Sequence, residues 1–391
     1  MHLALTPGQE AFRDEVRSYF ERVMTRDIRD RQAQYDLDSE TFRALIARIG
    51  HDGWLCPSWP EEFGGRGLSE VDQFIFFDET QRLGVPIPFL TTNTVGPTIM
   101  RFGTQAQKAD YLPRILRGEI LFSIGYSEAD AGTDLASLTT RAVRDGDSWV
   151  INGQKMWTSL IHHADYVWLA CRTDPDAAKH RGISIIIVPT DADGFSWTPV
   201  QTLGGGLTSA TYYENVRVPI DNLVGNEHEG WSLMTAQLNQ ERIALSSSGV
   251  VDRRLTEVRR WAQQTKLPDG RRVIDQEWVQ GNLARVRAQL EFLRLLNWKV
   301  AWSASQGRVD PADASAMKVF GSEFYIAAYR LLMEVVGAGS TVQRGSPGAV
   351  LEADLESAIR AAPILTFGGG TNEVQREIIA TVGLGLARAP R

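Results

Sequence analysis

One stretch decides the fold: DGDSWVINGQKMWTS, at residues 145–159. Its apolar and polar residues alternate, as in a half-buried strand, and its Asn-Gly pair at 152–153 is the strongest short signal of a β-hairpin turn. Two later stretches continue the strand pattern, TDPDAAKHRGISIIIVPT (173–190) and ATYYENVRVP (210–219). The sequence therefore predicts a block of β structure in the middle of the chain, with a hairpin that turns at the Asn-Gly pair.

Helical patterns lie on both sides of this block. Before it, apolar residues recur at helical spacing, and Thr6 followed by Pro7 is typical of a helix N-cap and a first helical residue. The order helices, strands, helices predicts an α+β fold of three domains, at 1–120, 121–228 and 229–391. After the strands, helices are predicted at 231–264, 276–306, 310–337 and 349–365, with a last one after Thr371.

Composition limits the function classes. The chain has 391 residues, 43% hydrophobic, with a net charge of −7, which gives nucleic acid no overall attraction. Apolar runs reach only about six residues against the ~20 of a membrane span. The first residues, MHLALTPGQEAFRDE, lack the basic start and apolar run of a signal peptide, so a cytoplasmic protein is expected. Cys56 and Cys171 have no metal-ligand spacing, and no metal site is predicted.

The helix predicted at 231–264 carries an acidic residue on its apolar stripe. Met234, Leu238 and Leu245 mark the stripe, and Glu241 lies three residues after Leu238 and four before Leu245. A carboxylate on a buried helix face has a raised pKa, which suits a general base that works near neutral pH. By periodicity alone, an ion pair with an arginine of the same helix, such as Arg242, is the more frequent explanation.

Two polar segments are candidates for binding. GGGTNEVQRE (368–377) joins three glycines to a helix start, with Thr371 or Asn372 as N-cap and a capping-box pattern from Asn372 to Gln375. Free N–H groups there favour a phosphate or a polarised carbonyl, although an ordinary tight turn explains the glycines as well.

The second segment is YSEADAGTDLASL (126–138), followed by Trp157 and two hydroxyl residues. Short hydroxyls beside an indole suit a flat heterocycle, while turn chemistry and a core tryptophan are equally good explanations. His162 and His163 are adjacent, so on a strand they would face opposite sides, and neither has a spaced His or Cys partner for a metal site. The residues alone indicate an enzyme or binding protein with an apolar cavity.

Taken together, these segments resemble the acyl-CoA dehydrogenase family over nearly the whole chain. The resemblance implies an N-terminal helical domain, a central β-domain, a C-terminal four-helix bundle, and FAD between the last two. The implied reaction is α,β-dehydrogenation of an acyl-CoA thioester, in which a carboxylate removes the α-proton and flavin N5 accepts a hydride. The motifs that carry the resemblance are WPEEFGGRG (59–67), YSEADAGTDLASL (126–138), INGQKMWTS (151–159), NVRVP (215–219) and GGTNEVQREIIA (369–380).

The resemblance also assigns roles to residues. Many members carry the base where this chain has Gly369, whereas members that act on branched or long acyl chains carry it where this chain has Glu241. Glu241 is therefore the expected base, Gly369 an N–H donor to the thioester carbonyl, and Arg242 and Thr133 substrate contacts. The expected FAD contacts are Tyr126, Ser127, Trp157, Ser159, Gly370, Thr371 and Glu373.

The half of the FAD site that the family contributes across the dimer departs from its pattern. The family's Arg-x-x-Phe-Gly segment is not recognisable in QQTKLPDGRRVIDQ (263–276), and Glu334 replaces a glutamine near the diphosphate. This resembles actinobacterial steroid side-chain subunits that form α2β2 heterotetramers with a second homologous chain; a homo-oligomer is the alternative. The expected substrate is an acyl-CoA, and the expected process is lipid metabolism, in particular steroid degradation. The expected electron acceptor is of the electron-transfer flavoprotein type. A non-catalytic partner subunit and a flavin oxygenase are the alternative functions.

Overall fold

The structure, a computed structural model, describes residues 4–33, 38–244, 246–308 and 310–387, except the side chains of residues 33 and 238–244. Its first part is helical. Thr6 is the N-cap of α1, its hydroxyl accepts from the Gln9 N–H, and Pro7 is the first helical residue, as predicted. The elements before the sheet are α1 (Pro7–Val23), α2 (Arg26–Ala33), α3 (Ser39–His51), α4 (Glu70–Leu83), the π-helical turn η2 (Leu90–Val95), α5 (Gly96–Phe102) and α6 (Gln105–Leu116).

The middle of the chain forms one mixed sheet. Within the described residues its strand order is β6-β7-β3-β2-β4-β5-β8, and β1 pairs in parallel with β4. The strands are β1 (Phe122–Gly125), β2 (Arg141–Asp145), β3 (Ser148–Lys155), β4 (Tyr166–Arg172), β5 (Ile183–Pro189), β6 (Phe195–Gln201), β7 (Leu207–Pro219) and β8 (Leu223–Val224).

The prediction of a hairpin turn at the Asn-Gly pair is wrong, because the turn lies elsewhere. Strands β2 and β3 are joined by Gly146 and Asp147, so Asp145 pairs with Ser148, and Gly146 has a φ of +61°. The Asn-Gly pair instead lies inside β3, where the register with β7 shifts between Ile151 and Gly153. Asn-Gly tolerates positive φ in a β-bulge as readily as in a turn, so local sequence does not separate the two.

Strands β4 and β5 are buried on both faces. Trp168 and Ala170 of β4 join a core that includes the N-terminal helices, whereas Val167, Leu169 and Cys171 join a second core on the other face. This explains the short continuous apolar run of β4, since a strand covered on both sides does not alternate.

Helices return after the sheet. The single helix predicted at 231–264 is wrong, because the structure has two helices there, which end and begin on either side of Ser246–Ser248. Helices α9 and α10 lie within one residue of their predicted ranges, 276–306 and 310–337. The helix predicted at 349–365 is shorter, because Leu351, Glu352 and Ala353 have positive φ and 3₁₀ turns flank the α-helical part. The C-terminal helices are α7 (Gly230–Ala244), α8 (Gly249–Gln264), α9 (Glu277–Ser305), α10 (Pro311–Val336), α11 (Asp354–Ala361) and α12 (Asn372–Ile378).

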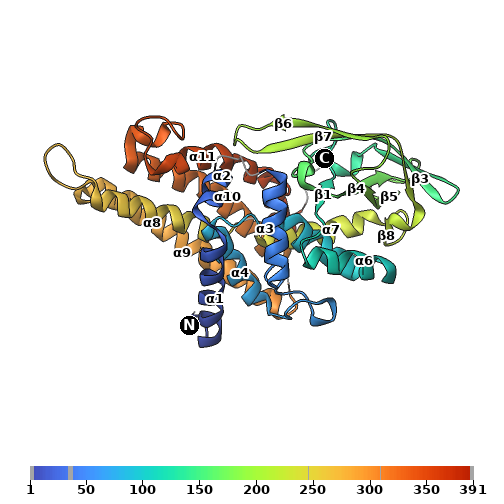
Figure 1. The fold of residues 1–391 in the computed structure, drawn as a ribbon, viewed down its shortest axis with the longest axis horizontal. Coiled ribbons are helices and arrows are strands. Elements are labelled where there is room, and N and C mark those ends of the chain that lie inside the picture. The colour runs from blue at the N-terminus through green and yellow to red at the C-terminus, as the bar shows by residue number, and fades with distance from the viewer. Residues whose placement is uncertain (1–3, 34–37, 245, 309, 388–391) are drawn as a thin grey trace.

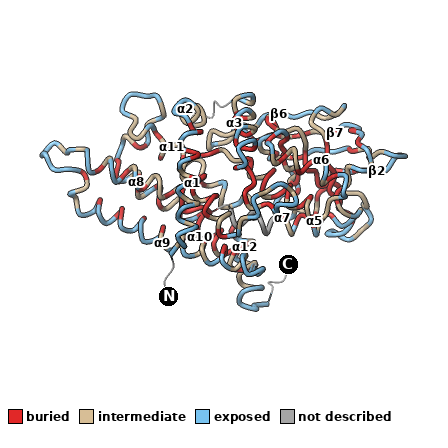
Figure 2. The backbone as a smooth tube through the Cα atoms, turned by 60° about the horizontal axis from the view of Figure 1, so that its bottom comes forward, coloured by how far each residue is buried: buried red, intermediate tan, exposed pale blue. Residues whose placement is uncertain are grey.

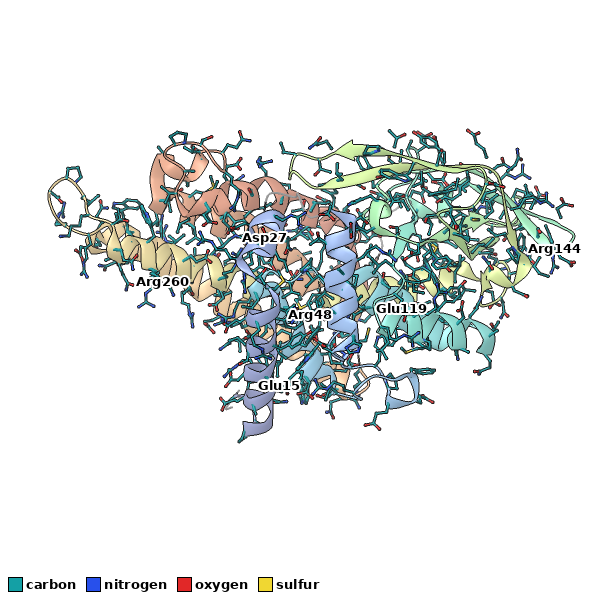
Figure 3. All side chains as sticks on the ribbon, viewed as in Figure 1. Glu15, Asp27, Arg48, Glu119, Arg144 and Arg260 are labelled. Atoms are coloured by element: carbon teal, nitrogen blue, oxygen red, sulfur yellow. The ribbon has the colours of Figure 1, made fainter. Side chains whose placement is uncertain are left out.

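The molecule is elongated, with the sheet at one end and the α8–α9 hairpin projecting at the other (Figure 1). The predicted α+β fold is confirmed. Buried segments gather in the middle, while the far end of the α8–α9 hairpin is exposed (Figure 2). Charged side chains such as Arg144 and Arg260 project outward near the two ends (Figure 3). No helix among the described residues is long and apolar enough to cross a membrane.

Candidate active site

Helix α10 connects the segments that carry the candidate site residues. It contacts α7, which contains residue 241, and α12, which follows the glycine turn of residues 368–370. Helix α7 in turn packs against β5 and the π-helical turn η2. The tertiary fold thus brings α7 and the glycine turn before α12 to the same helix, although these two segments are more than 100 residues apart in the sequence.

Tyr126 lies just after β1 and its hydroxyl is buried against α7. The hydroxyl accepts from the Trp168 indole N–H at 3.2 Å and donates to Oε1 of Gln237. Because the indole can only donate, the tyrosine proton is directed to the glutamine oxygen, and the glutamine NH₂ faces elsewhere. That buried Nε2 has no hydrogen-bond partner among the described residues.

A buried ion pair fixes the backbone of the same segment. Nζ of Lys155, at the end of β3, lies 2.8 Å from Oε1 of Glu128 and donates to the Tyr126 carbonyl at 3.0 Å. Burial opposes ionisation of Glu128, but the charge of Lys155 and its hydrogen bond, helped by the N–H groups of Thr140 and Thr139, lower its pKa to about 2. Ser127 is joined to the next segment, since its carbonyl accepts from the Met156 N–H at 2.8 Å.

Trp157 follows this pair and presents its ring outward. Its side chain is 56% exposed, on a backbone with φ +66°, where a bulky residue is strained. The neighbouring Thr158 is buried and anchored to β7 through the Ser209 carbonyl. Ser159 is anchored as well, because its carbonyl accepts from the Ser123 hydroxyl at 2.8 Å. An exposed indole on a firmly held loop is the arrangement expected of a stacking surface.

The glycine turn before α12 has the backbone conformation that only glycine adopts easily. Gly369 and Gly370 have φ values of +66° and +90°. Thr371 is the N-cap of α12, since its hydroxyl accepts from the Val374 N–H. The predicted capping box from Asn372 to Gln375 is wrong, because both side chains turn to α10 instead.

Two further predicted contacts lie on the surface. Thr133 is exposed in the loop between β1 and β2, and its neighbour Asp134 forms an ion pair with Lys179. Glu373 is exposed in the first turn of α12. Nothing in the structure tests the roles predicted for these residues, and they stay predictions.

Glu241 and Arg242 lie in the last turns of α7, but their side chains are outside the described part of the structure. His162 and His163 lie in a short 3₁₀ turn (Ile161–His163), so they are not on a strand with opposite faces. Burial and the neighbouring His162 lower the pKa of His163 to about 4, and its ring stacks on Phe42. The described residues contain no group of three or more His, Cys, Asp or Glu placed to hold a metal ion.

Sequence reasoning missed the residues that hold the site together. Lys155 follows the same alternation along β3 as the buried Trp149 and Ile151. This alternation was the sequence signal that could have predicted its burial. Lys318 lies on α10 next to the fully buried Met317, a second cation within an apolar pattern. The hydrogen bond between Gln237 and Tyr126 joins residues far apart in the chain, so no local sequence pattern predicts it.

Comparison with known proteins identifies the family. Residues 6–119, 123–216 and 228–384 match the N-terminal, middle and C-terminal domains of acyl-CoA dehydrogenases. The chain belongs to the acyl-CoA dehydrogenase family, and it is an FAD-dependent enzyme of that class.

Individual relatives resemble it over their full length. Acyl-CoA dehydrogenase FadE26 of Mycobacterium tuberculosis is 57% identical over 402 residues, with 100% of both chains covered. A chain of the ChsE4-ChsE5 complex from Mycobacterium tuberculosis is 58% identical with a TM-score of 0.94, covering 100% of each chain. A chain of the Tcur3481-Tcur3483 steroid ACAD is 49% identical with a TM-score of 0.95, again with 100% of each chain covered.

The residues present fit FAD. The exposed Trp157 ring offers a stacking face, and Gly369, Gly370 and Thr371 offer N–H groups for which no protein acceptor is found among the described residues. An isoalloxazine ring needs both an aromatic neighbour and hydrogen-bond donors to its carbonyl oxygens.

Proposed function

We propose that this chain α,β-dehydrogenates a bulky branched or steroid side-chain acyl-CoA thioester, with Glu241 as the base. The steroid assignment is supported by the Tcur3481-Tcur3483 structure, which is described as a steroid ACAD, and by its full-length similarity to this chain. The assignment of the base to Glu241 is supported by Gly369, because many family members carry the base at that position and glycine cannot accept a proton.

One contact carries the proposal for Glu241. Gln237 lies one helical turn before it, and residues four apart in an α-helix share a face. The Gln237 side chain is buried and bonded to the Tyr126 hydroxyl, beside the proposed flavin-binding strand. This supports an orientation of α7 in which the face of residue 241 is directed toward the cofactor region.

The residues of this chain have distinct tasks in the proposed reaction. Glu241 would take the α-proton, and the Gly369 N–H would donate to the thioester carbonyl, which acidifies that proton. Trp157 would pack on the isoalloxazine ring, while Tyr126, Ser127, Ser159, Gly370, Thr371 and Glu373 would hold FAD. When bound, FAD supplies a two-electron acceptor for the hydride lost from the β-carbon.

The experiment is a Glu241→Gln substitution. We expect kcat to fall by about 10³-fold or more, with bound FAD and secondary structure unchanged, because glutamine keeps the shape but cannot accept the proton. Turnover of branched and steroid side-chain acyl-CoA is measured with an artificial electron acceptor.

The matched control is Glu229→Gln, an exposed glutamate just before α7, which is expected to leave kcat unchanged. Normal turnover in the Glu241→Gln enzyme would exclude Glu241 as the base. Hydroxylated product with rapid consumption of oxygen would indicate an oxygenase instead.

We also propose that the enzyme works as an α2β2 assembly with a second homologous chain and passes electrons to an electron-transfer flavoprotein. The ChsE4-ChsE5 and Tcur3481-Tcur3483 relatives are complexes of two kinds of chain. In this chain, Glu334 occupies the place expected near a diphosphate and accepts from the Asn282 amide at 2.9 Å. A carboxylate there repels a diphosphate, which supports FAD sites at unlike interfaces only.

A further inference from the structure

We infer that Lys318 is a positioning residue, whose buried ammonium sets the direction of the peptide groups in the 368–371 turn toward FAD and the thioester. The inference rests on the proposed function for the thioester, and on the FAD dependence of the family for the cofactor. It concerns a side chain on α10 that touches neither ligand in the proposed site.

Lys318 lies in the first half of α10, and it is only 1% exposed. Its Nζ donates to the Gly370 carbonyl at 2.7 Å and to Oδ1 of Asn372 at 2.8 Å. An ammonium buried this deeply is costly unless its protons are bonded, so these contacts are strong, charge-assisted hydrogen bonds. The turn therefore has a fixed electrostatic anchor on its α10 side.

The anchor has a directional consequence. In a trans peptide the C=O and the following N–H point in opposite directions. Because Lys318 holds the Gly370 oxygen toward α10, the Thr371 N–H is directed away from α10. Glycine at 369 and 370 leaves this peptide free to rotate, since both residues have positive φ and no side chain to restrict them. Without the ammonium, the peptide between Gly370 and Thr371 could adopt several orientations.

The surrounding contacts support the same role. Asn372 is held in turn by the hydroxyl of Ser322, and Oε1 of Gln375 accepts from Ser315 at 2.8 Å. A Cβ on Gly370 would lie 2.7 Å from Nε2 of Gln375, so the turn is packed against these side chains. All of these anchors come from one face of α10.

The same helix also contacts the end of α7. A Cβ on Gly321, three residues after Lys318, would lie 2.5 Å from Cβ of Ser246. Residues three apart share a helix face. Lys318 thus fixes the turn relative to the segment that follows Glu241, which is the geometry that proton removal and carbonyl polarisation require together.

The test uses the holoenzyme with Lys318→Ala, assayed alone and with added propylammonium, which replaces the deleted atoms. We expect FAD to dissociate about 10- to 100-fold more readily and kcat to fall about 10²-fold with little change in KM. Propylammonium is expected to restore both quantities in part, whereas tetramethylammonium, which has the charge but no N–H, is not. The matched control is Lys299→Ala, an exposed lysine paired with Asp313 on the surface.

Unchanged FAD dissociation and kcat in Lys318→Ala, or equal restoration by both cations, would overturn the inference. If Lys318→Ala loses its secondary structure, Lys318→Met takes its place, because methionine keeps the buried stem and removes only the ammonium that holds the Gly370 carbonyl. Normal FAD dissociation and normal kcat in that variant would also overturn the inference. FAD dissociation is read without substrate. A wild-type enzyme that binds FAD but oxidises no acyl-CoA would contradict the proposed function and leave this measurement valid.

Discussion

Two lysines, Lys155 and Lys318, are buried almost completely, and each donates to a backbone carbonyl of the candidate site. Glu128 accepts from Lys155 and from the N–H groups of Thr139 and Thr140. Its carboxylate is therefore shared between strand β3 and the loop after Tyr126. Removing one partner of such a pair leaves the other charge buried, which costs more than the pair itself contributes.

Glu128→Gln is expected to lower the free energy of unfolding by about 3–5 kcal/mol at pH 7. The pKa of Glu128 is about 2 in the folded state, against ~4.3 unfolded. Its contribution is therefore complete above the unfolded pKa and is lost as the pH falls toward the folded one. Urea unfolding at a series of pH values measures this contribution, as the difference in free energy of unfolding between the wild type and the variant.

The control is Asp145→Asn, which breaks an exposed pair with Arg217. It is expected to change the free energy of unfolding by less than about 1 kcal/mol. A Glu128→Gln difference that stays constant between about pH 5 and pH 2 would contradict the assignment of the low pKa.

At the scale of elements, the break between α7 and α8 is held from three helices. Oδ1 of Asp78, in α4, accepts from the hydroxyls of Ser247 and Ser248 and from the Gly249 N–H, the first at 2.8 Å. Asn297 of α9 donates to the Ser246 carbonyl, and Tyr325 of α10 donates to that of Ser247. Burial raises the pKa of Asp78 even though these three bonds lower it.

Gly249→Ala tests how tightly this junction is packed. The added Cβ would lie 2.2 Å from the Asp78 carbonyl oxygen, so α8 must move away from α4. We expect a loss of about 1–3 kcal/mol in the free energy of unfolding. Gly281→Ala is the matched control inside α9, since its Cβ would meet nothing within 4 Å.

Gly281→Ala is expected to stabilise the protein by about 0.5–1 kcal/mol, because alanine loses less conformational entropy in a helix. Thermal melting of both variants gives the comparison. Equal effects of the two substitutions would mean that the close approach of α4 and α8 does not constrain the junction.

At the scale of the whole molecule, large apolar side chains remain exposed on α9. Leu295 and Trp302 are 49% and 61% exposed, and they lie seven residues apart, on one face of the helix. The side of α9 that carries them is not covered by the described part of the chain. Such a surface fits the proposed assembly with a second chain.

FAD counting tests that assembly. We expect the chain co-expressed with its homologous partner to form a tetramer with one FAD for each pair of unlike chains, because like interfaces would place Glu334 near a diphosphate. Mass measurement by light scattering and flavin absorbance give the ratio. One FAD for every chain would contradict the proposal, and a flavin-bound, active homo-oligomer of this chain alone would support the simpler assembly.

The sequence by itself determined the order of helices and strands, the ends of α9 and α10, the starts of α1 and α12, and the family, because periodicity, capping and motifs are local. Only the tertiary structure decided that Asn152–Gly153 is a bulge, that the chain breaks at Ser246–Ser248, and that Lys318 meets Gly370. In each case the deciding contact comes from residues far away in the chain, such as β7, α4 and α12. A local pattern permits several conformations, and long-range packing and hydrogen bonding select one of them.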